Sequence, residues 1–120
     1  MTDHSAPSAE RQDTRTASVR RLNDDFRRTG VGGRVMMTSG IAALPRAEQL
    51  AIVAAVAAFD GFTYENDPYG EHDCALLNVS GRQILWKIDY FDHALRCHSP
   101  DAADPDQTTR VMTIMLAEEY

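Results

Sequence analysis

The sequence predicts an α+β domain in which two helices pack on a small antiparallel sheet of three to four strands. Three observations support this prediction. Residues 50–59 are all apolar, residues 14–28 carry an apolar stripe at helical spacing, and residues 74–90 hold two strand-like runs joined by a two-residue turn. A chain of 120 residues is long enough for one modest core and too short for two.

The N-terminal segment predicts disorder followed by a helix. Residues 1–13 are rich in Ser, Ala, Pro and charge, so we expect them to be disordered and residues 14–120 to form the single domain. Apolar residues at i, i+3 and i+7 predict a helix over 14–28, with Gly30 as its stop signal. The residues of this stripe are Val19, Leu22 and Phe26.

The middle of the chain predicts a short strand and the central helix of the core. The strand is expected over 34–41, after a glycine-rich turn that lacks the Lys-Ser/Thr pair of a phosphate-binding loop. The helix is expected from Pro45 to about Asp60, because proline favours the first helical turn. Since this helix is apolar on nearly every side, we expect it to be buried on nearly every side against the sheet.

The dipeptide Ser80-Gly81 predicts a hairpin and fixes its register, because a two-residue turn determines which residues lie opposite each other. On the face expected to join the core, the predicted pairs are Val79–Arg82, Leu77–Ile84, Ala75–Trp86 and Asp73–Ile88. On the other face, they are Asn78–Gln83, Leu76–Leu85, Cys74–Lys87 and His72–Asp89.

The C-terminal segment 108–119 is ambiguous between a strand and a helix. Its Thr, Val and Ile residues favour a third antiparallel strand, and this is the assignment that we prefer. A closing helix stays open as the alternative, because Asp104-Pro105 upstream is a suitable helix start.

The net charge of −6 is divided unevenly along the chain. Residues 1–59 hold eight Arg and six acids, a net charge of +2, whereas residues 60–120 hold twelve acids and four basic residues, a net charge of −8. An acidic half repels phosphate, which argues against direct nucleic-acid binding and favours a basic protein partner or a bound cation. With no apolar run of membrane-spanning length, no secretory signal and two cysteines, the cytoplasm is the expected compartment and no membrane is expected as a partner.

The predicted register gathers a polar patch at the open end of the hairpin. One interpretation is a metal-dependent hydrolase, with His72 and Asp89 as ligands or acid and base and Lys87 as the electrophile. Against it, the chain has no Asp/Glu-x-Lys triplet. A second interpretation is structural, with a cross-strand hydrogen bond from His72 to Asp89 and Lys87 held by neighbouring acids.

A zinc site is the third chemical possibility. Its ligands would be His72, Cys74, Cys97 and His98. These residue types suit tetrahedral zinc, but His-x-Cys and an adjacent Cys-His pair are not the spacings that zinc geometry favours. We therefore expect neither a metal nor another cofactor.

We favour a non-catalytic binding protein over an enzyme. Aromatic side chains within a polar rim are typical of protein interfaces, and the region around the hairpin end combines them with acids. The predicted binding surface consists of Tyr64, Asp67, Tyr69, Glu71, His72, Lys87, Asp89, Tyr90 and Asp92.

Three motifs resemble a bacterial family known only as a domain of unknown function. They are NDPYGEHD at 66–73, WKIDYFD at 86–92 and RVMTIMLAEEY at 110–120, and the resemblance covers roughly residues 18–120. The family usually has an aromatic residue where this chain has Cys74. The resemblance implies no activity, but it implies an accessory role on plasmids and other mobile DNA. An inhibitor of a host defence nuclease, of the restriction or CRISPR type, is the concrete form of that expectation.

Overall fold

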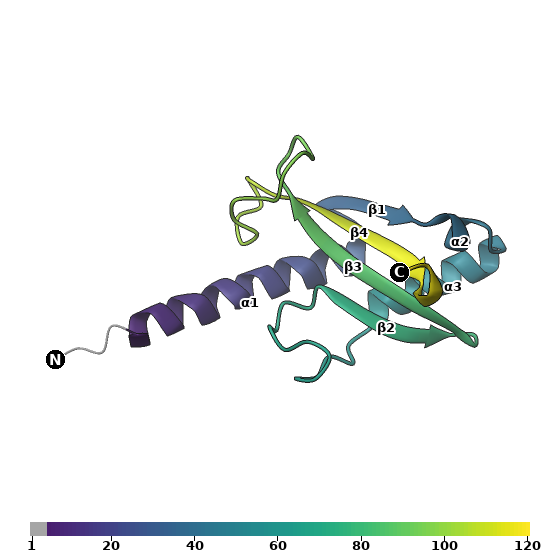
Figure 1. Cartoon of the computed structure of the whole chain (residues 1–120), viewed down its shortest axis with the longest axis horizontal. Coiled ribbons are helices and arrows are strands. Elements are labelled where there is room, and N and C mark those ends of the chain that lie inside the picture. The colour runs from purple at the N-terminus through teal and green to yellow at the C-terminus, as the bar shows by residue number, and fades with distance from the viewer. Residues whose placement is uncertain (1–4) are drawn as a thin grey trace.

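The computed structural model describes residues 5–120, which form a four-stranded sheet with two long helices on one of its faces (Figure 1). The elements follow in the order α1 (Ser5–Thr29), β1 (Gly33–Met37), α2 (Ser39–Ala42), α3 (Arg46–Ala58), β2 (Cys74–Val79), β3 (Arg82–Phe91), β4 (Thr109–Leu116) and η1 (Ala117–Glu119). The predicted α+β class is therefore confirmed.

The strands lie in the order β1-β4-β3-β2, so β1 and β2 are the two edges of the sheet. The strands β2, β3 and β4 pair antiparallel, as expected, but β1 runs parallel to β4. The sheet is thus mixed and not antiparallel throughout. This pairing could not be predicted, because the partner of β1 lies at the other end of the chain and no local turn sets its direction.

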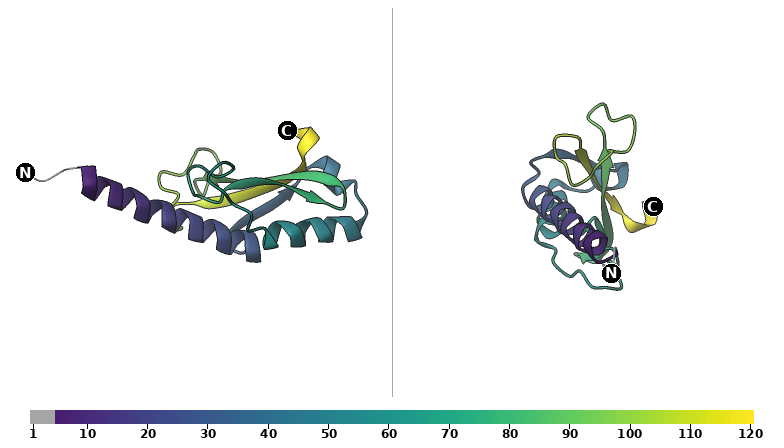
Figure 2. Two further views of the ribbon diagram at one scale, coloured as in Figure 1. Left: turned by 90° about the horizontal axis from the view of Figure 1, so that it is seen from below. Right: turned by 90° about the vertical axis from the view of Figure 1, so that its left-hand side faces the viewer.

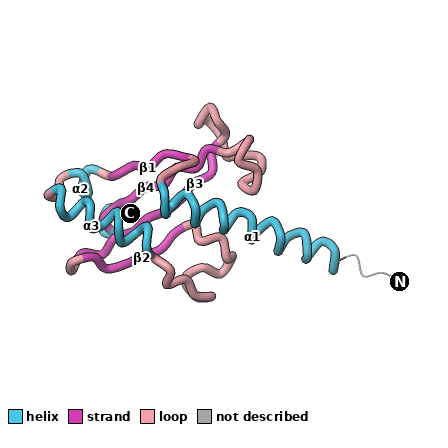
Figure 3. Tube along the Cα trace, turned by 180° about the vertical axis from the view of Figure 1, so that it is seen from behind, coloured by secondary structure: helices cyan, strands magenta, loops and turns pink. Residues whose placement is uncertain are grey.

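Both long helices cover the same face of the sheet, and the C-terminal turn rises from the opposite face (Figure 2). Viewed from behind, α1 and α3 lie across this covered face (Figure 3). The core forms between the helices and the sheet. Its fully buried side chains include Phe26, Ile41, Ile52, Val56, Ile84, Trp86 and Ile114.

The first helix is longer than predicted. We expected disorder to residue 13, but α1 begins at Ser5; residues 1–4 of that expectation lie outside the described residues. The first half of α1 extends beyond the sheet in Figure 1, so helix continuity from the packed half carries it outward. Its end agrees with the prediction, because Gly30 has a φ of +74° and donates its N–H to the carbonyl of Phe26 at 2.7 Å.

The strand expected over 34–41 ends at Met37, and Ser39–Ala42 form the short helix α2. The chain turns into a helix here because this turn buries the apolar side chain of Ile41 completely. The residues of β1 itself are mostly exposed, as expected for a strand at the edge of the sheet.

The central helix α3 packs on the sheet, but the expectation that it is buried on nearly every side is wrong. Ile52 and Val56 are buried, whereas Leu50 is 57% exposed. A single sheet layer covers only one side of a helix, and the alanines of α3 leave a small apolar area on the other side. No helix within residues 5–120 is both long and apolar enough to cross a membrane.

The predicted hairpin register is confirmed from Cys74–Lys87 to Val79–Arg82. The predicted core face is also correct, because Ala75, Trp86 and Ile88 are buried. The preferred assignment of the C-terminal segment is confirmed as well, since β4 pairs antiparallel with β3.

Candidate interaction site

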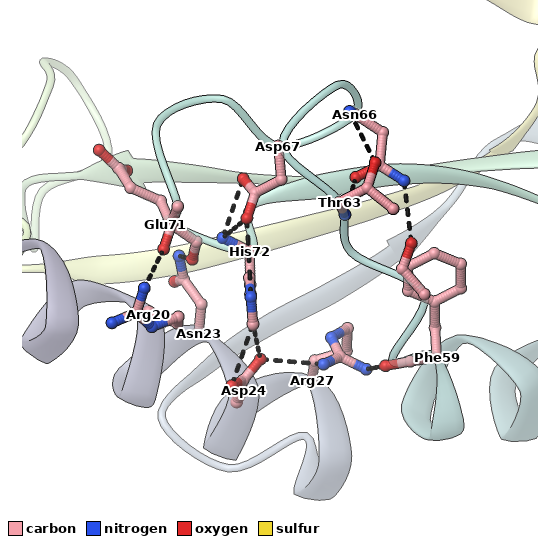
Figure 4. A network of polar contacts seen from close by, with 12 residues as sticks. Arg20, Asn23, Asp24, Arg27, Phe59, Thr63, Asn66, Asp67, Glu71 and His72 are labelled. Atoms are coloured by element: carbon pink, nitrogen blue, oxygen red, sulfur yellow. Dashed lines mark hydrogen bonds and ion pairs between the residues drawn. The ribbon is translucent and has the colours of Figure 1, made fainter.

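The segment that connects α3 to β2, residues 60–73, is folded by its own side chains; we call it the interaction loop. Thr63 and Asn66 close its first turn reciprocally: the Thr63 N–H donates to Asn66 Oδ1 at 2.7 Å, and the Asn66 N–H donates to Thr63 Oγ1 at 3.2 Å. Asn66 also donates through Nδ2 to the carbonyl of Gly61 at 2.9 Å. This turn therefore has a fixed shape without a regular element (Figure 4).

A second turn reverses the loop before β2. The carboxylate of Asp67 accepts the N–H of His72 at 3.3 Å, and the carbonyl of Asp67 accepts the N–H of Gly70 at 3.0 Å. Gly70 and His72 both have positive φ values, +72° and +54°. A left-handed backbone is uncommon for a residue with a β-carbon, so the surrounding hydrogen bonds must hold His72 in it.

This turn overturns the predicted pair between His72 and Asp89. The strand β2 begins at Cys74, and the backbone of His72 has already left the direction of the strand. The side chain of His72 instead points to α1, where Nδ1 lies 2.9 Å from Asp24 Oδ1. Its Nε2 lies 3.6 Å from Asp67 Oδ2, and its ring stacks on Phe62 with the centroids 3.8 Å apart.

Arg27 connects α1, α3 and the start of the interaction loop. Its guanidinium is buried and donates to three carbonyls at the C-terminal end of α3, those of Val56, Ala57 and Phe59, at 2.9, 3.1 and 2.8 Å. Main-chain donors run out at this end of the helix, where the carbonyl of Val56 also accepts the N–H of Phe59 at 3.3 Å. The buried cation therefore supplies hydrogen bonds to these carbonyls and complements the negative end of the helix dipole. Arg27, which lies in the last turn of α1, thus caps the end of α3 and not that of its own helix.

Asp24 joins the two groups just described. Its Oδ1 accepts from Arg27 at 3.0 Å and also lies beside the His72 ring. Arg27, Asp24, His72 and Asp67 thus form one chain of polar contacts from the base of α3 to the second turn of the loop (Figure 4).

Asn23 holds the last part of the loop. It has no exposed surface, and its Nδ2 donates to the carbonyl of Glu71 at 3.0 Å and to Tyr90 Oη at 2.7 Å. Its Oδ1 accepts from Arg110 Nε at 2.7 Å. One turn earlier on α1, Arg20 donates to the carbonyl of Gly70 at 3.1 Å.

The network also accounts for Tyr90, which we expected on the binding surface. Its hydroxyl donates to Glu71 Oε1 at 2.7 Å, and burial raises the pKa of Tyr90 far above that of a free phenol, so it stays protonated. The guanidinium of Arg110 stacks on its ring at 5.1 Å, and burial lowers the pKa of Arg110. Tyr90 and Glu71 therefore belong to the polar network behind the loop and not to the exposed binding surface.

Sequence reasoning missed Asn23 and Arg110. A signal existed for Asn23, because it lies four residues after Val19 and three before Phe26, on the stripe that predicted the helix. A polar residue on an apolar stripe is buried and must find partners. Those partners are distant in sequence, so the stripe alone could not identify them.

Two aromatic side chains project from this fixed loop into solvent. Tyr64 is 82% exposed and Tyr69 is 84% exposed. Asp60 and Glu65 are exposed beside them in the sequence, whereas the side chain of Asp67 is only 6% exposed because it accepts from the loop backbone. The interaction loop thus presents two tyrosines and two acids on a hydrogen-bonded frame.

The predicted binding surface is divided between two faces of the sheet. Lys87 and Asp89 form an ion pair, and strand alternation puts them on the open face, away from the helices and from His72. There they line a hollow of about 380 Å³ with Cys74 and Tyr120. Asp92 lies at the end of β3, where its carboxylate accepts the N–H of Arg96 at 3.0 Å and closes a turn.

The same division separates the four residues considered for zinc. Burial raises the pKa of the Cys74 thiol on the open face, while Cys97 is exposed and His98 stacks on Phe91 beyond the end of β3. Within residues 5–120, no group of three or more His, Cys, Asp or Glu side chains has the arrangement of a metal site. Burial, followed by the charge of Glu71, raises the pKa of Asp73 near this hollow.

Fold and site together define a small α+β domain in which a buried polar network holds a surface loop. The chain belongs to the DUF3768 family, described as a protein of unknown function, because residues 37–119 match the model of that family. Neither the curated proteins nor the solved structures contain a significant match to it. The matched segment includes the whole interaction loop, whereas Asn23, Asp24 and Arg27 precede it.

Proposed function

We propose that this chain is a non-catalytic protein-binding domain that acts through the interaction loop. The observation that carries the proposal is the exposure of Tyr64 and Tyr69, 82% and 84%, on a loop whose backbone is fixed by side-chain hydrogen bonds. Tyrosine combines a large apolar ring with a polar tip, and few surface features suit a protein partner better.

The rigidity of the loop supports the proposal independently of its composition. A flexible loop loses conformational freedom when it binds, and this loss subtracts from the affinity. Here Asn23, Arg20 and His72 already hold the loop against α1 before any partner arrives. Burying polar groups costs desolvation free energy, and here these groups hold the two tyrosines in one geometry before binding.

Charge indicates the kind of partner. Residues 60–120 carry a net charge of −8, and the exposed acids Asp60 and Glu65 accompany the tyrosines. A basic protein surface is the complement, because opposite potentials accelerate encounter and orient the partners. A nucleic-acid channel is such a surface. The family resemblance implies an accessory role on mobile DNA. This role and the negative charge together favour an inhibitor of a host defence nuclease that occupies the channel in place of nucleic acid.

The hydrolase alternative requires His72, Lys87 and Asp89 to act on one substrate. His72 lies between Asp24 and Asp67 on the helix side, whereas Lys87 and Asp89 lie on the open face. This separation favours binding over hydrolysis. We expect the protein to act in the cytoplasm, where Cys74 and Cys97 would stay reduced.

The test is inhibition of purified restriction and CRISPR-type nucleases by the wild type and by a Tyr64→Ala/Tyr69→Ala variant. We expect the wild type to inhibit or bind one of them, and the variant to lose affinity by roughly 1,000-fold, since two hot-spot tyrosines that each contribute about 2 kcal/mol together contribute about 4 kcal/mol. Tyr120→Ala is the matched control, because Tyr120 is 84% exposed but lies at the C-terminus. It should bind like the wild type.

Equal affinity of the double variant and the wild type would show that the interaction loop is not the binding surface. Divalent-ion-dependent hydrolysis that disappears in a folded His72→Ala variant would replace the binding proposal with the hydrolase. The melting temperature is the folding control, and that of the Tyr64→Ala/Tyr69→Ala variant should stay close to that of the wild type because both tyrosines are exposed.

A further inference from the structure

The edge strand β1 is unprotected and apolar. The last three residues of this strand are Val35, Met36 and Met37, whose exposed fractions are 39%, 52% and 36%. Proteins usually guard such an edge with proline, a bulge or several charges, because unpaired strands bind other strands. In β1, Arg34 is the only charged residue. The other edge, β2, exposes a single large apolar side chain, Leu76.

The register of β1 shows which of its main-chain groups are free to pair outward. The N–H of Thr38 donates to the carbonyl of Ile114 at 3.1 Å, continuing the parallel ladder with β4. In a parallel pair, alternate residues of one strand bond to the neighbour. Arg34 and Met36 therefore bond to β4, and the N–H and C=O groups of Val35 and Met37 point away from the sheet.

We propose that β1 pairs antiparallel with β1 of a second copy of this chain, about a two-fold axis at Val35. The two four-stranded sheets then form one continuous sheet. Val35 lies opposite Val35 of the second copy, and the two exchange both main-chain hydrogen bonds. Gly33 lies opposite Met37, so the long methionine side chain meets a residue without a side chain. This proposal is independent of the proposed function.

The charges of the edge fit a second copy in this register. Arg34 lies opposite Met36 of the other copy and not directly opposite the second Arg34. Its two diagonal neighbours in the other copy are Thr38 and the second Arg34, each about 7–8 Å away between α-carbons and within reach of a long side chain, so a carboxylate beside Thr38 is needed to offset the like charge. Thr38 Oγ1 donates to Glu119 Oε1 at 2.6 Å. Each arginine thus approaches a carboxylate of the other copy, and the symmetry makes this contact twice.

The test is molar mass by light scattering and sedimentation over a wide concentration range. We expect the wild type to reach twice the monomer mass and to go no further, because a two-fold pair leaves no second β1 edge free. Val35→Lys should be monomeric, since it sets two lysines against each other at the axis. Arg34→Glu should raise the protein concentration below which the dimer dissociates. Leu76→Lys on the β2 edge is the matched control and should still dimerise.

Amide hydrogen exchange locates the contact at residue resolution. The N–H groups of Val35 and Met37 should be protected only at concentrations where the dimer forms, whereas that of Met36, bonded to β4, should be protected at all concentrations. A wild type that stays monomeric at its highest soluble concentration would overturn the proposal. So would open-ended assembly, or a dimer that is lost in Leu76→Lys but kept in Val35→Lys. If Val35→Lys does not fold, the Arg34→Glu result decides.

Discussion

At the scale of single residues, Asn23 shows how one side chain can hold three segments together. It has no exposed surface, and its amide contacts Glu71 of the interaction loop, Tyr90 of β3 and Arg110 of β4. A buried amide that uses both its donor and its acceptor sides specifies one arrangement of its partners. The orientation of α1 on the sheet therefore depends on it.

Asn23→Leu keeps the length and branching of the side chain but removes these hydrogen bonds. The carbonyl of Glu71 and the guanidinium of Arg110 would be left with fewer partners in a buried place, which we expect to destabilise the fold by about 2–4 kcal/mol. Urea unfolding measures the change. Arg21→Leu, at an exposed position nearby on α1, is the control and should alter stability by less than about 0.5 kcal/mol. Equal stabilities of the two variants would contradict this account of Asn23.

At the scale of elements, the parallel pairing of β1 with β4 depends on a glycine. A β-carbon built on Gly33 would lie 2.1 Å from the carbonyl oxygen of Arg110, a main-chain atom that cannot move alone. The start of β1 thus lies closer to β4 than a residue with a β-carbon would permit. This close approach at Gly33 positions the rest of β1 at the edge of the sheet.

Gly33→Ala should push the start of β1 away from β4. We expect a loss of about 1–3 kcal/mol in the free energy of unfolding, the usual cost of forcing a group into occupied space. Faster amide exchange at Arg34 and Met36 would show that the damage lies in β1. Arg34→Ala is the neighbouring control. If Gly33→Ala is as stable as the wild type, the close approach is not a constraint on the fold.

The elements also show what the sequence could predict and what it could not. The register of the β2–β3 hairpin was predictable because a two-residue turn is local and determines every pair that follows. The end of α1 at Gly30 was predictable for the same reason. The turn at His72 was not, since a left-handed φ at a residue other than glycine depends on contacts with Asp67 and Asp24.

The candidate site was predictable only in part. The exposed Tyr64 and Tyr69 lie where the polar and aromatic composition indicated. The buried contacts behind them join residues 48, 67 and 87 positions apart, from Asn23 to Glu71, Tyr90 and Arg110. A helical stripe reveals that such a residue is buried but not which residues it meets.

At the scale of the whole molecule, the C-terminus is fastened to the first half of the chain by Glu119. Its carboxylate accepts from Thr38 Oγ1 at 2.6 Å, from the N–H of Leu116 at 2.9 Å and from the N–H of Gly40 at 3.0 Å. These hydrogen bonds, that of Thr38 first, lower the pKa of Glu119 below its ordinary value. The fastening therefore depends on the ionised form.

This dependence gives a pH effect of known sign. Because its folded pKa is lower than its unfolded pKa, Glu119 contributes stability that is present above the unfolded pKa, about 4.3 for glutamate, and is lost as the pH falls through the folded pKa. Glu119→Gln should be less stable than the wild type at neutral pH, and the difference should shrink in acid. Thermal melts between acid and neutral pH, at a concentration that keeps the protein monomeric, measure this. A difference that stays constant with pH would contradict the role of the charge.

The long first helix has a consequence for how the molecule comes apart. Its second half is anchored by Asn23, Asp24 and Arg27, while its first half runs past the edge of the sheet (Figure 1). A helical arm of this kind opens from its tip, because each residue lost there breaks one main-chain hydrogen bond, and the ion pair from Arg15 to Asp101 is exposed and therefore weak. Fraying should therefore travel inward along the helix and stop abruptly at the anchored residues. The same three side chains that hold the loop would thus limit the local unfolding of α1.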